Sequence, residues 1–206
     1  MRNTQNLLPE LPTSKAEILG WDDIIGDVIP KTLGVGSPQL VTFIDDVRWF
    51  SYAAGEDGDI VFHLPHTYAR GTDLFIHVHW AHNGTNISGT FDLRTHLTYA
   101  RGHNQPAHGN FHSDVENHIV VSNLSLAAMP QYRHRIDEIK ISTPGGAATL
   151  LDTNILEPDG LILCHYDVDV IPNITGGSGE PFIFCLDIHH QVDRIGTLNK
   201  SPDFYR

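Results

Sequence analysis

Two histidines, one residue apart, give this sequence its clearest candidate for chemistry. His77 and His79 stand near the end of the run Asp73–Trp80, which reads Asp-Leu-Phe-Ile-His-Val-His-Trp. In a β-strand, alternate side chains point to the same face, so the two imidazoles lie on one face, roughly 7 Å apart along the backbone. At that spacing they could share a divalent metal ion if another strand supplied a third ligand.

A second strand could complete such a site. In the apolar run at 182–189, Asp187 and His189 share one face. If this strand neighbours the first, its two polar side chains meet His77 and His79. We predict that these four residues form a buried polar network, satisfied internally or placed at a subunit contact. The alternative is a metal site whose ligands are His77, His79 and His189.

The pattern around the histidine pair agrees only in part with a metal-binding cupin barrel. Gly71 followed by His77-x-His79 matches the first half of the cupin pattern. The glutamate expected four or five residues after the second histidine is missing, because Asn83 and Gly84 stand there. The second glycine, proline and histidine motif is also missing, as are the common hydrolase, phosphate-binding, zinc-protease and EF-hand motifs. We therefore expect no enzymatic activity and no cofactor.

The elements that must position these side chains are predicted to be strands. The 206 residues include 40% apolar and 18% charged residues, enough for one buried core, and 18 Gly and 12 Pro divide the chain into short apolar runs. Strands are expected at residues 40–44, 47–53, 59–64, 73–82, 89–100, 116–126, 132–142, 161–166 and 182–189, with a helix as the alternative at 133–141. This pattern is typical of a mostly β, antiparallel two-sheet β-sandwich of jelly-roll type.

Alternation of residue types predicts which faces are buried. In the first histidine strand, the expected core residues are Leu74, Ile76, Val78 and Trp80. In the strand at 89–100, apolar residues from Phe91 to Tyr99 alternate with polar ones. Arg94 and His96 lie on its polar face, so this strand is a further candidate neighbour of the histidine network.

The first 37 residues differ from the rest. Ser14 and Glu17 have the spacing of a capping box, and Gly20 would end a helix of one or two turns. The expected division is an extended N-terminal arm with a short helix at 1–37 and a β-sandwich domain at 38–206. The arm carries enough apolar residues to pack against its own domain or against a neighbouring subunit.

Charge and composition exclude several partners. The net charge of −12 disfavours binding to a nucleic-acid backbone. No run is long and apolar enough to span a membrane, and the first residues do not resemble a secretion signal, so we expect a soluble protein that stays where it is made. Cys164 and Cys185 are expected to be reduced thiols in separate strands.

Two other polar segments could be considered as metal sites, but the sequence favours a different interpretation of each. The segment 101–114 carries His103, His108 and His112 without a regular element to orient them, which predicts a solvated loop rather than a metal cluster. Asp167-x-Asp169 could bind calcium, but the alternation around it favours a strand end that faces water.

The order and spacing of several short motifs resemble a family of small structural proteins of tailed-bacteriophage virions. The resemblance covers most of residues 21–197, with Ile76 standing where the family commonly has proline and His190 where it commonly has an aromatic residue. The motifs are Trp21-Asp22-Asp23, Leu64-Pro65-His66, Gly71-Thr72-Asp73, His77-Val78-His79-Trp80, Leu161-Ile162-Leu163-Cys164, and Leu186-Asp187-Ile188-His189-His190-Gln191-Val192-Asp193 followed by Gly196. The resemblance implies an oligomeric β-sandwich of the virion and supplies no catalytic residues.

These observations lead to one expected function and one alternative. We expect a non-enzymatic structural protein of a phage virion, made in the cytoplasm of the bacterial host. It would act as a capsid decoration or cement protein of the head, or as a neck or tail attachment protein. Its partners would be copies of itself, as a homotrimer, and capsid, neck or tail subunits, with neither nucleic acid nor membrane. The alternative is a cupin-like metal-dependent enzyme or a glycan-binding receptor module.

Overall fold

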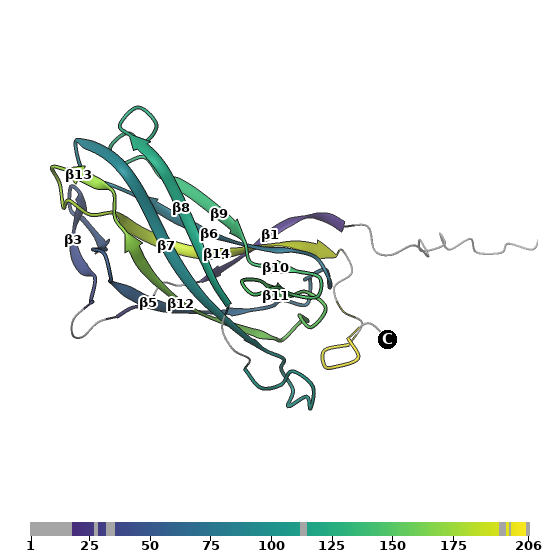
Figure 1. The fold of residues 1–206 in the computed structure, drawn as a ribbon. Helices are drawn as coiled ribbons and strands as arrows, with labels where there is room; N and C mark the ends of the chain where they lie inside the picture. The colour runs from purple at the N-terminus through teal and green to yellow at the C-terminus, as the bar shows by residue number, and fades with distance from the viewer. Residues whose placement is uncertain are drawn as a thin grey trace, which may run out of the picture.

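The computed structural model describes residues 18–26, 29–31, 36–111, 115–193, 197 and 199–204. Over these ranges the chain forms two antiparallel sheets that pack face to face, with one short parallel pair of strands beside them (Figure 1). The predicted mostly β, two-sheet sandwich is confirmed, and the arrangement is consistent with a jelly roll. No helix among the described residues is long and apolar enough to cross a membrane.

The first sheet has six strands, and β14 lies inside it. The order is β3 (Gln39–Ile44), β4 (Val47–Ser51), β14 (Phe182–Asp193), β6 (Leu74–Ala81) and β9 (Arg135–Lys140). Strand β1 (Ile18–Gly26) pairs with the second half of β14, on the side opposite β6. The histidine strand β6 is therefore flanked by β14 and β9.

The second sheet covers the inner face of the first. Its order is β13 (Asn173–Thr175), β7 (Asn86–Ala100), β12 (Leu161–Val170), β5 (Asp57–His63) and β2 (Ile29–Pro30), and β8 (Val115–Ser125) also pairs with β7. The short parallel pair is β10 (Ser142–Thr143) with β11 (Leu151–Asp152).

The core lies between the two sheets and follows the predicted alternation. The four apolar residues predicted to face inward on β6 are all fully buried: Leu74, Ile76, Val78 and Trp80. From the facing sheet, Phe91 stacks on Trp80 with ring centroids 4.5 Å apart. Since these apolar side chains occupy the inner face of β6, its histidines must point to the outer face.

The N-terminal segment differs from the predicted arm. Residues 18–26 form the sheet strand β1, and residues 29–30 form β2, which pairs with β5. This part of the expected arm therefore belongs to the sandwich. Gly26 permits the close approach, because a Cβ atom there would lie 2.4 Å from the Ile60 side chain. The helix predicted to begin at Ser14 falls mainly on residues 14–17, outside the described residues.

The structure gives the bounds of two further predicted strands. The segment 132–142 contains strand β9 at 135–140, so the alternative helix at 133–141 is wrong. Strand β12 runs on to Val170 and includes Asp167, whose carboxylate accepts two hydrogen bonds from the Arg94 guanidinium at 2.9 and 3.0 Å. That carboxylate is thus held in an ion pair between strands of the second sheet.

Three tyrosine hydroxyls are enclosed by the sandwich. The hydroxyls of Tyr52 and Tyr166 are 2.9 Å apart and share a hydrogen bond in the core. The Tyr99 hydroxyl accepts a hydrogen bond from the backbone N–H of Glu157 at 3.0 Å. Burial raises the pKa of Tyr52 and of Tyr99 to about 12, and burial with the neighbouring Tyr52 raises the pKa of Tyr166 as well.

We predict that stability falls steeply in alkaline solution. An unfolded tyrosine has a pKa of about 10. The raised pKa values therefore contribute stability that is fully present below pH about 10 and is lost as the pH rises toward about 12. The measurement is the urea midpoint between pH 8 and 12. In Tyr52→Phe, which lacks one such hydroxyl, the decline should be shallower. A wild-type midpoint that stays constant across this range would contradict the prediction.

Candidate functional site

The predicted polar residues of two strands meet on the outer face of the first sheet. Strand β6 carries His77 and His79, and β14 carries Asp187 and His189. In the antiparallel register Asp187 lies directly opposite His77. Their strand neighbours Ile76 and Ile188 fill the core, so the polar side chains share the opposite face. The structure thus brings together the four residues that the sequence grouped.

Asp187 is the centre of this group. Its Oδ2 is hydrogen-bonded to His79 Nε2 at 2.9 Å. Its Oδ1 lies 3.0 Å from His77 Nδ1, but this oxygen is buried and makes no hydrogen bond within the described structure. The three side chains are largely shielded from solvent, with exposed fractions of 5% for Asp187, 11% for His77 and 17% for His79. A carboxylate and two imidazoles therefore converge in a nearly dry position.

Strand β9 adds two residues that the sequence analysis did not include. Glu138 lies opposite His77, and its Oε2 is 2.9 Å from His77 Nε2. His134, just before the strand, stacks on His79, and its Nε2 is 3.0 Å from His79 Nδ1. Burial, with the nearby His79, lowers the pKa of His134, which favours its neutral form. The sequence held a signal for both residues, because His134, Ile136 and Glu138 are two positions apart and would share one face of a strand.

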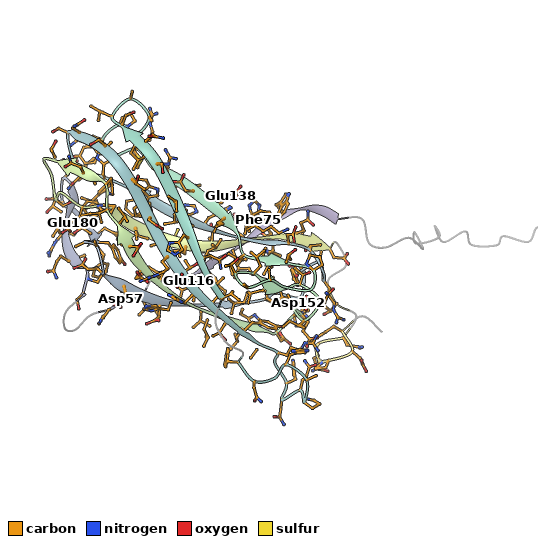
Figure 2. All side chains as sticks on the ribbon, in the orientation of Figure 1. Asp57, Phe75, Glu116, Glu138, Asp152 and Glu180 are labelled. Carbon is orange, nitrogen blue, oxygen red and sulfur yellow. The ribbon has the colours of Figure 1, made fainter. Side chains whose placement is uncertain are left out.

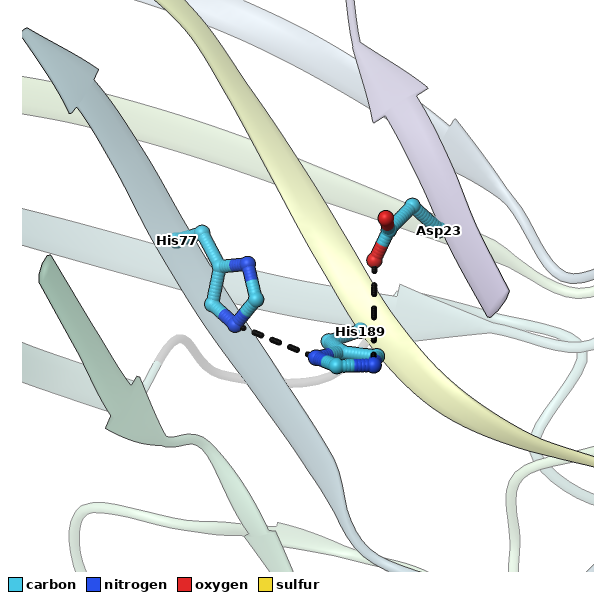
Figure 3. Close-up of side chains that lie close together, drawn as sticks. All are labelled: Asp23, His77 and His189. Atoms are coloured by element: carbon cyan, nitrogen blue, oxygen red, sulfur yellow. Dashed lines mark hydrogen bonds and ion pairs between the residues drawn. The ribbon is translucent and has the colours of Figure 1, made fainter. Parts of the chain in front are cut away.

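His189 links the group to the edge strand β1. Figure 3 shows its ring between His77 and Asp23, with Nδ1 at 3.3 Å from His77 Nε2 and Nε2 at 4.0 Å from Asp23 Oδ1. Trp21 packs edge-on against His189 and Phe75, with ring centroids 4.8 and 5.8 Å away. We call His77, His79, His134, His189, Asp187, Glu138 and Asp23 the histidine network.

A shallow hollow opens beside the network. Trp21, Phe75, Glu138 and His189 line its volume of about 170 Å³. Phe75 and Glu138 lie close together on the outer face of the first sheet (Figure 2). Two residues of the network, Glu138 and His189, therefore border a small hollow that has two aromatic walls.

The strand at 89–100 does not join the network. It forms β7 of the second sheet, where His96 Nε2 lies 3.5 Å from Glu116 Oε2. Arg94 and His96, the further candidates from the sequence, therefore do not extend the polar face beside His77. The reason is topological, because the chain crosses from the first sheet to the second between β6 and β7.

A second group of histidines surrounds Asp159. The expected solvated loop places His103 Nε2 at 2.7 Å from this carboxylate, and the Nε2 atoms of His66 and His63 are 3.1 and 3.3 Å from it. Burial alone would raise the pKa of Asp159, but the hydrogen bond from His103 and the nearby histidines together lower it. His112 lies outside the described residues.

Both cysteines carry free thiols, as predicted. Cys164 is buried and Cys185 half-buried. Burial raises the pKa of each thiol, and Asp187 adds to the effect at Cys185.

Comparisons with known proteins give no family. No protein-family model and no curated protein matches the chain. Similar solved structures include CBM22-1 and GH10 modules of a Clostridium thermocellum xylanase with xylohexaose (14% identity, TM-score 0.35, 81% of this chain and 28% of that chain). Another is a carbohydrate-binding module specific for non-crystalline cellulose, CBM28 (11% identity, TM-score 0.32, 81% of this chain and 78% of that chain). A third is the enzymatically active domain of tailspike protein 4 of bacteriophage CBA120 (9% identity, TM-score 0.29, 86% of this chain and 19% of that chain). At such low identities and TM-scores the similarity concerns the arrangement of strands alone.

Proposed function

We propose that this protein is a non-enzymatic structural subunit of a tailed-phage virion, which assembles through the outer face of its first sheet. The virion resemblance in the sequence supports this proposal, and its main motifs are neighbours in the fold. Trp21-Asp22-Asp23 lies on β1, Leu186–Asp193 on β14, and His77-Val78-His79-Trp80 on β6. These three strands are adjacent in one sheet.

The observation that carries the proposal is a set of exposed apolar side chains around the histidine network. Ile25 is 72% exposed and lies opposite Asp187, while Ile136 is 49% exposed and lies opposite His79. Trp21, beside His189, is 49% exposed. Clusters of exposed apolar side chains are typical of protein contact sites. The buried centre of such a site contains few charged residues.

Assembly would bury these side chains against another subunit. The network would then lie under the contact, with its charges already paired within one chain. Because the chain carries a net charge of −12, the remaining surface would repel nonspecific partners and keep the subunits soluble before assembly. The partners in this proposal are further copies of the chain, as a trimer, and capsid, neck or tail subunits of the particle.

The oligomeric state and the particle test this proposal together. We predict that the purified chain elutes in light-scattering chromatography near three times 22.9 kDa, about 69 kDa. Ile25→Asp places a charge in the contact and should give monomers. The matched control is Val120→Asp, at a residue that is 54% exposed on β8 of the second sheet, which should stay assembled.

Electron cryomicroscopy of intact virions supplies the second arm. Density for the sandwich is expected on the head, neck or tail, with the outer face of the first sheet against a neighbour. A wild-type chain that stays monomeric and is absent from particles would refute the proposal. Equal loss of assembly in both variants would refute the assigned face.

A further inference from the structure

We propose that His77, His79 and Asp187 form a binding site for a divalent transition-metal ion of the zinc class. One ligand atom from each residue lies within 4.8 Å of those of the other two, and the nitrogens that face the Asp187 carboxylate are His77 Nδ1 and His79 Nε2. Imidazole nitrogen and carboxylate oxygen are ordinary zinc ligands, and three protein ligands leave a fourth position for water. The site does not depend on the proposed virion role.

Two contacts within the group have nearly the spacing expected between ligands of one ion. Ligands at 2.0 to 2.2 Å around a tetrahedral zinc ion stand about 3.3 Å from one another. The two nitrogen-to-oxygen distances to Asp187 are now 3.0 and 2.9 Å. These two contacts use different carboxylate oxygens, so an ion would enter with an adjustment of all three side chains, whose ligand atoms already lie within 4.8 Å of one another.

The outer contacts orient both imidazoles for a cation. A neutral imidazole has one N–H, so His77 can donate to Glu138 or to Asp187, but not to both. If Nε2–H donates to Glu138, the Nδ1 lone pair points toward Asp187. Likewise, His79 Nδ1–H can donate to His134 and turn the Nε2 lone pair toward Asp187. Without metal, a proton on His79 Nε2 makes the hydrogen bond to Asp187. A bound cation would replace this proton while the N–H groups donate to Glu138 and His134, and such outer partners are usual for metal-bound histidines.

The Asp187 carboxylate supplies a further observation. Its Oδ1 is buried and makes no hydrogen bond within the described structure, although it lies 3.0 Å from His77 Nδ1. Leaving a buried acceptor unsatisfied costs on the order of 1 to 3 kcal/mol, and more when the group is charged. A metal ion at this position would satisfy that oxygen.

His189, which the sequence suggested as the third ligand, takes an outer position in this proposal. The alternative set is Asp23, His77 and His189 (Figure 3). It is more open to solvent, since the side chains of Asp23 and His189 are 47% and 30% exposed. It would also use His77 Nε2, the nitrogen that faces Glu138. The structure therefore favours Asp187 over His189 as the third ligand.

The test is zinc binding by the whole chain with any affinity tag removed. Protein stripped with EDTA is titrated with Zn²⁺ by calorimetry, and bound metal is counted by mass spectrometry after dialysis. One ion per chain is expected. Asp187→Asn and His79→Gln should abolish this stoichiometric binding, and the outer-shell change Glu138→Gln should weaken it about tenfold. The matched control is His118→Gln, which alters the Asp92, His118 and Asp169 group of the second sheet and should leave binding unchanged.

A measurement on the wild-type chain makes the result independent of variant folding. In long-range proton–nitrogen NMR spectra, Zn²⁺ should shift Nδ1 of one histidine and Nε2 of another, with a fixed end point at one equivalent. The site would be overturned if the wild-type chain did not retain zinc. It would also be overturned if His118→Gln abolished zinc binding while Asp187→Asn left it intact. Zinc binding is measured separately from the oligomeric state, which tests the proposed function. A failure of the metal site is therefore distinct from a failure of the proposed function.

Discussion

Asp187→Ala is expected to lower the free energy of unfolding by about 1 to 3 kcal/mol for each buried imidazole that it leaves without a partner. Asp187 is 5% exposed at its side chain and contacts both His77 and His79. Without the carboxylate, the two imidazoles face an empty and nearly dry space. Each imidazole loses its contact with the carboxylate, and β6 and β14 lose the link across their outer face.

A similar pair at the surface provides the control for this measurement. Asp59 Oδ1 lies 3.1 Å from His165 Nδ1, with side chains that are 75% and 44% exposed. Exposed pairs contribute little, so Asp59→Ala should change stability by less than about 0.5 kcal/mol. Urea denaturation of both variants in EDTA excludes any effect of bound metal. An Asp187→Ala variant as stable as Asp59→Ala would show that the network does not stabilise the sandwich.

Trp80→Ala is expected to cost about 3 to 5 kcal/mol for a different reason, the cavity left by a large core side chain. Trp80 is fully buried and stacks on Phe91 of the opposite sheet. Its indole N–H donates a hydrogen bond to Asp137 Oδ2 at 2.8 Å. The substitution thus removes a contact between the sheets and leaves Asp137 with one donor fewer.

Trp49 is the matched control, because it is 37% exposed and lies on strand β4 of the same sheet. Trp49→Ala should cost about 1 kcal/mol, mainly through loss of the hydrogen bond to the Ile183 carbonyl. Equal urea midpoints for the two variants would contradict the assignment of Trp80 to the centre of the core.

The sequence predicted best where one strand contained its own signal. The alternation from Leu74 to Trp80 located both the core face and the histidine face of β6, and the pattern around Asp187 did the same for β14. Side-chain period is a local property, so it can be seen without knowing which strands pair.

Strand pairing was the information that the sequence lacked. His77 and Glu138 are 61 residues apart in the chain and meet only because β9 pairs with β6. Nothing in either segment specifies this partner. The same gap explains why the strand with Arg94 remained a candidate neighbour of His77, although β7 lies in the other sheet.

The edge strand β1 was missed because its sequence alternates poorly. Trp21 is followed by Asp22 and Asp23 and then by two isoleucines, which disguises the period of two. The strand is defined instead by eight paired positions along β14 and by the close approach that Gly26 permits. Both features depend on tertiary contacts, so propensity alone favoured an arm.

The interior position of β14 has a consequence for how the protein is made. This strand is the last of those described along the chain, yet it pairs with β6, β1 and β4, which precede it by about a hundred residues or more. Pairing between such distant segments is slow, and it cannot begin on the ribosome until β14 has emerged. The first sheet, its histidine network and the proposed contact face are therefore completed together and late. If the protein assembles as proposed, synthesis itself would thus delay association, because an unfinished chain lacks the proposed contact face.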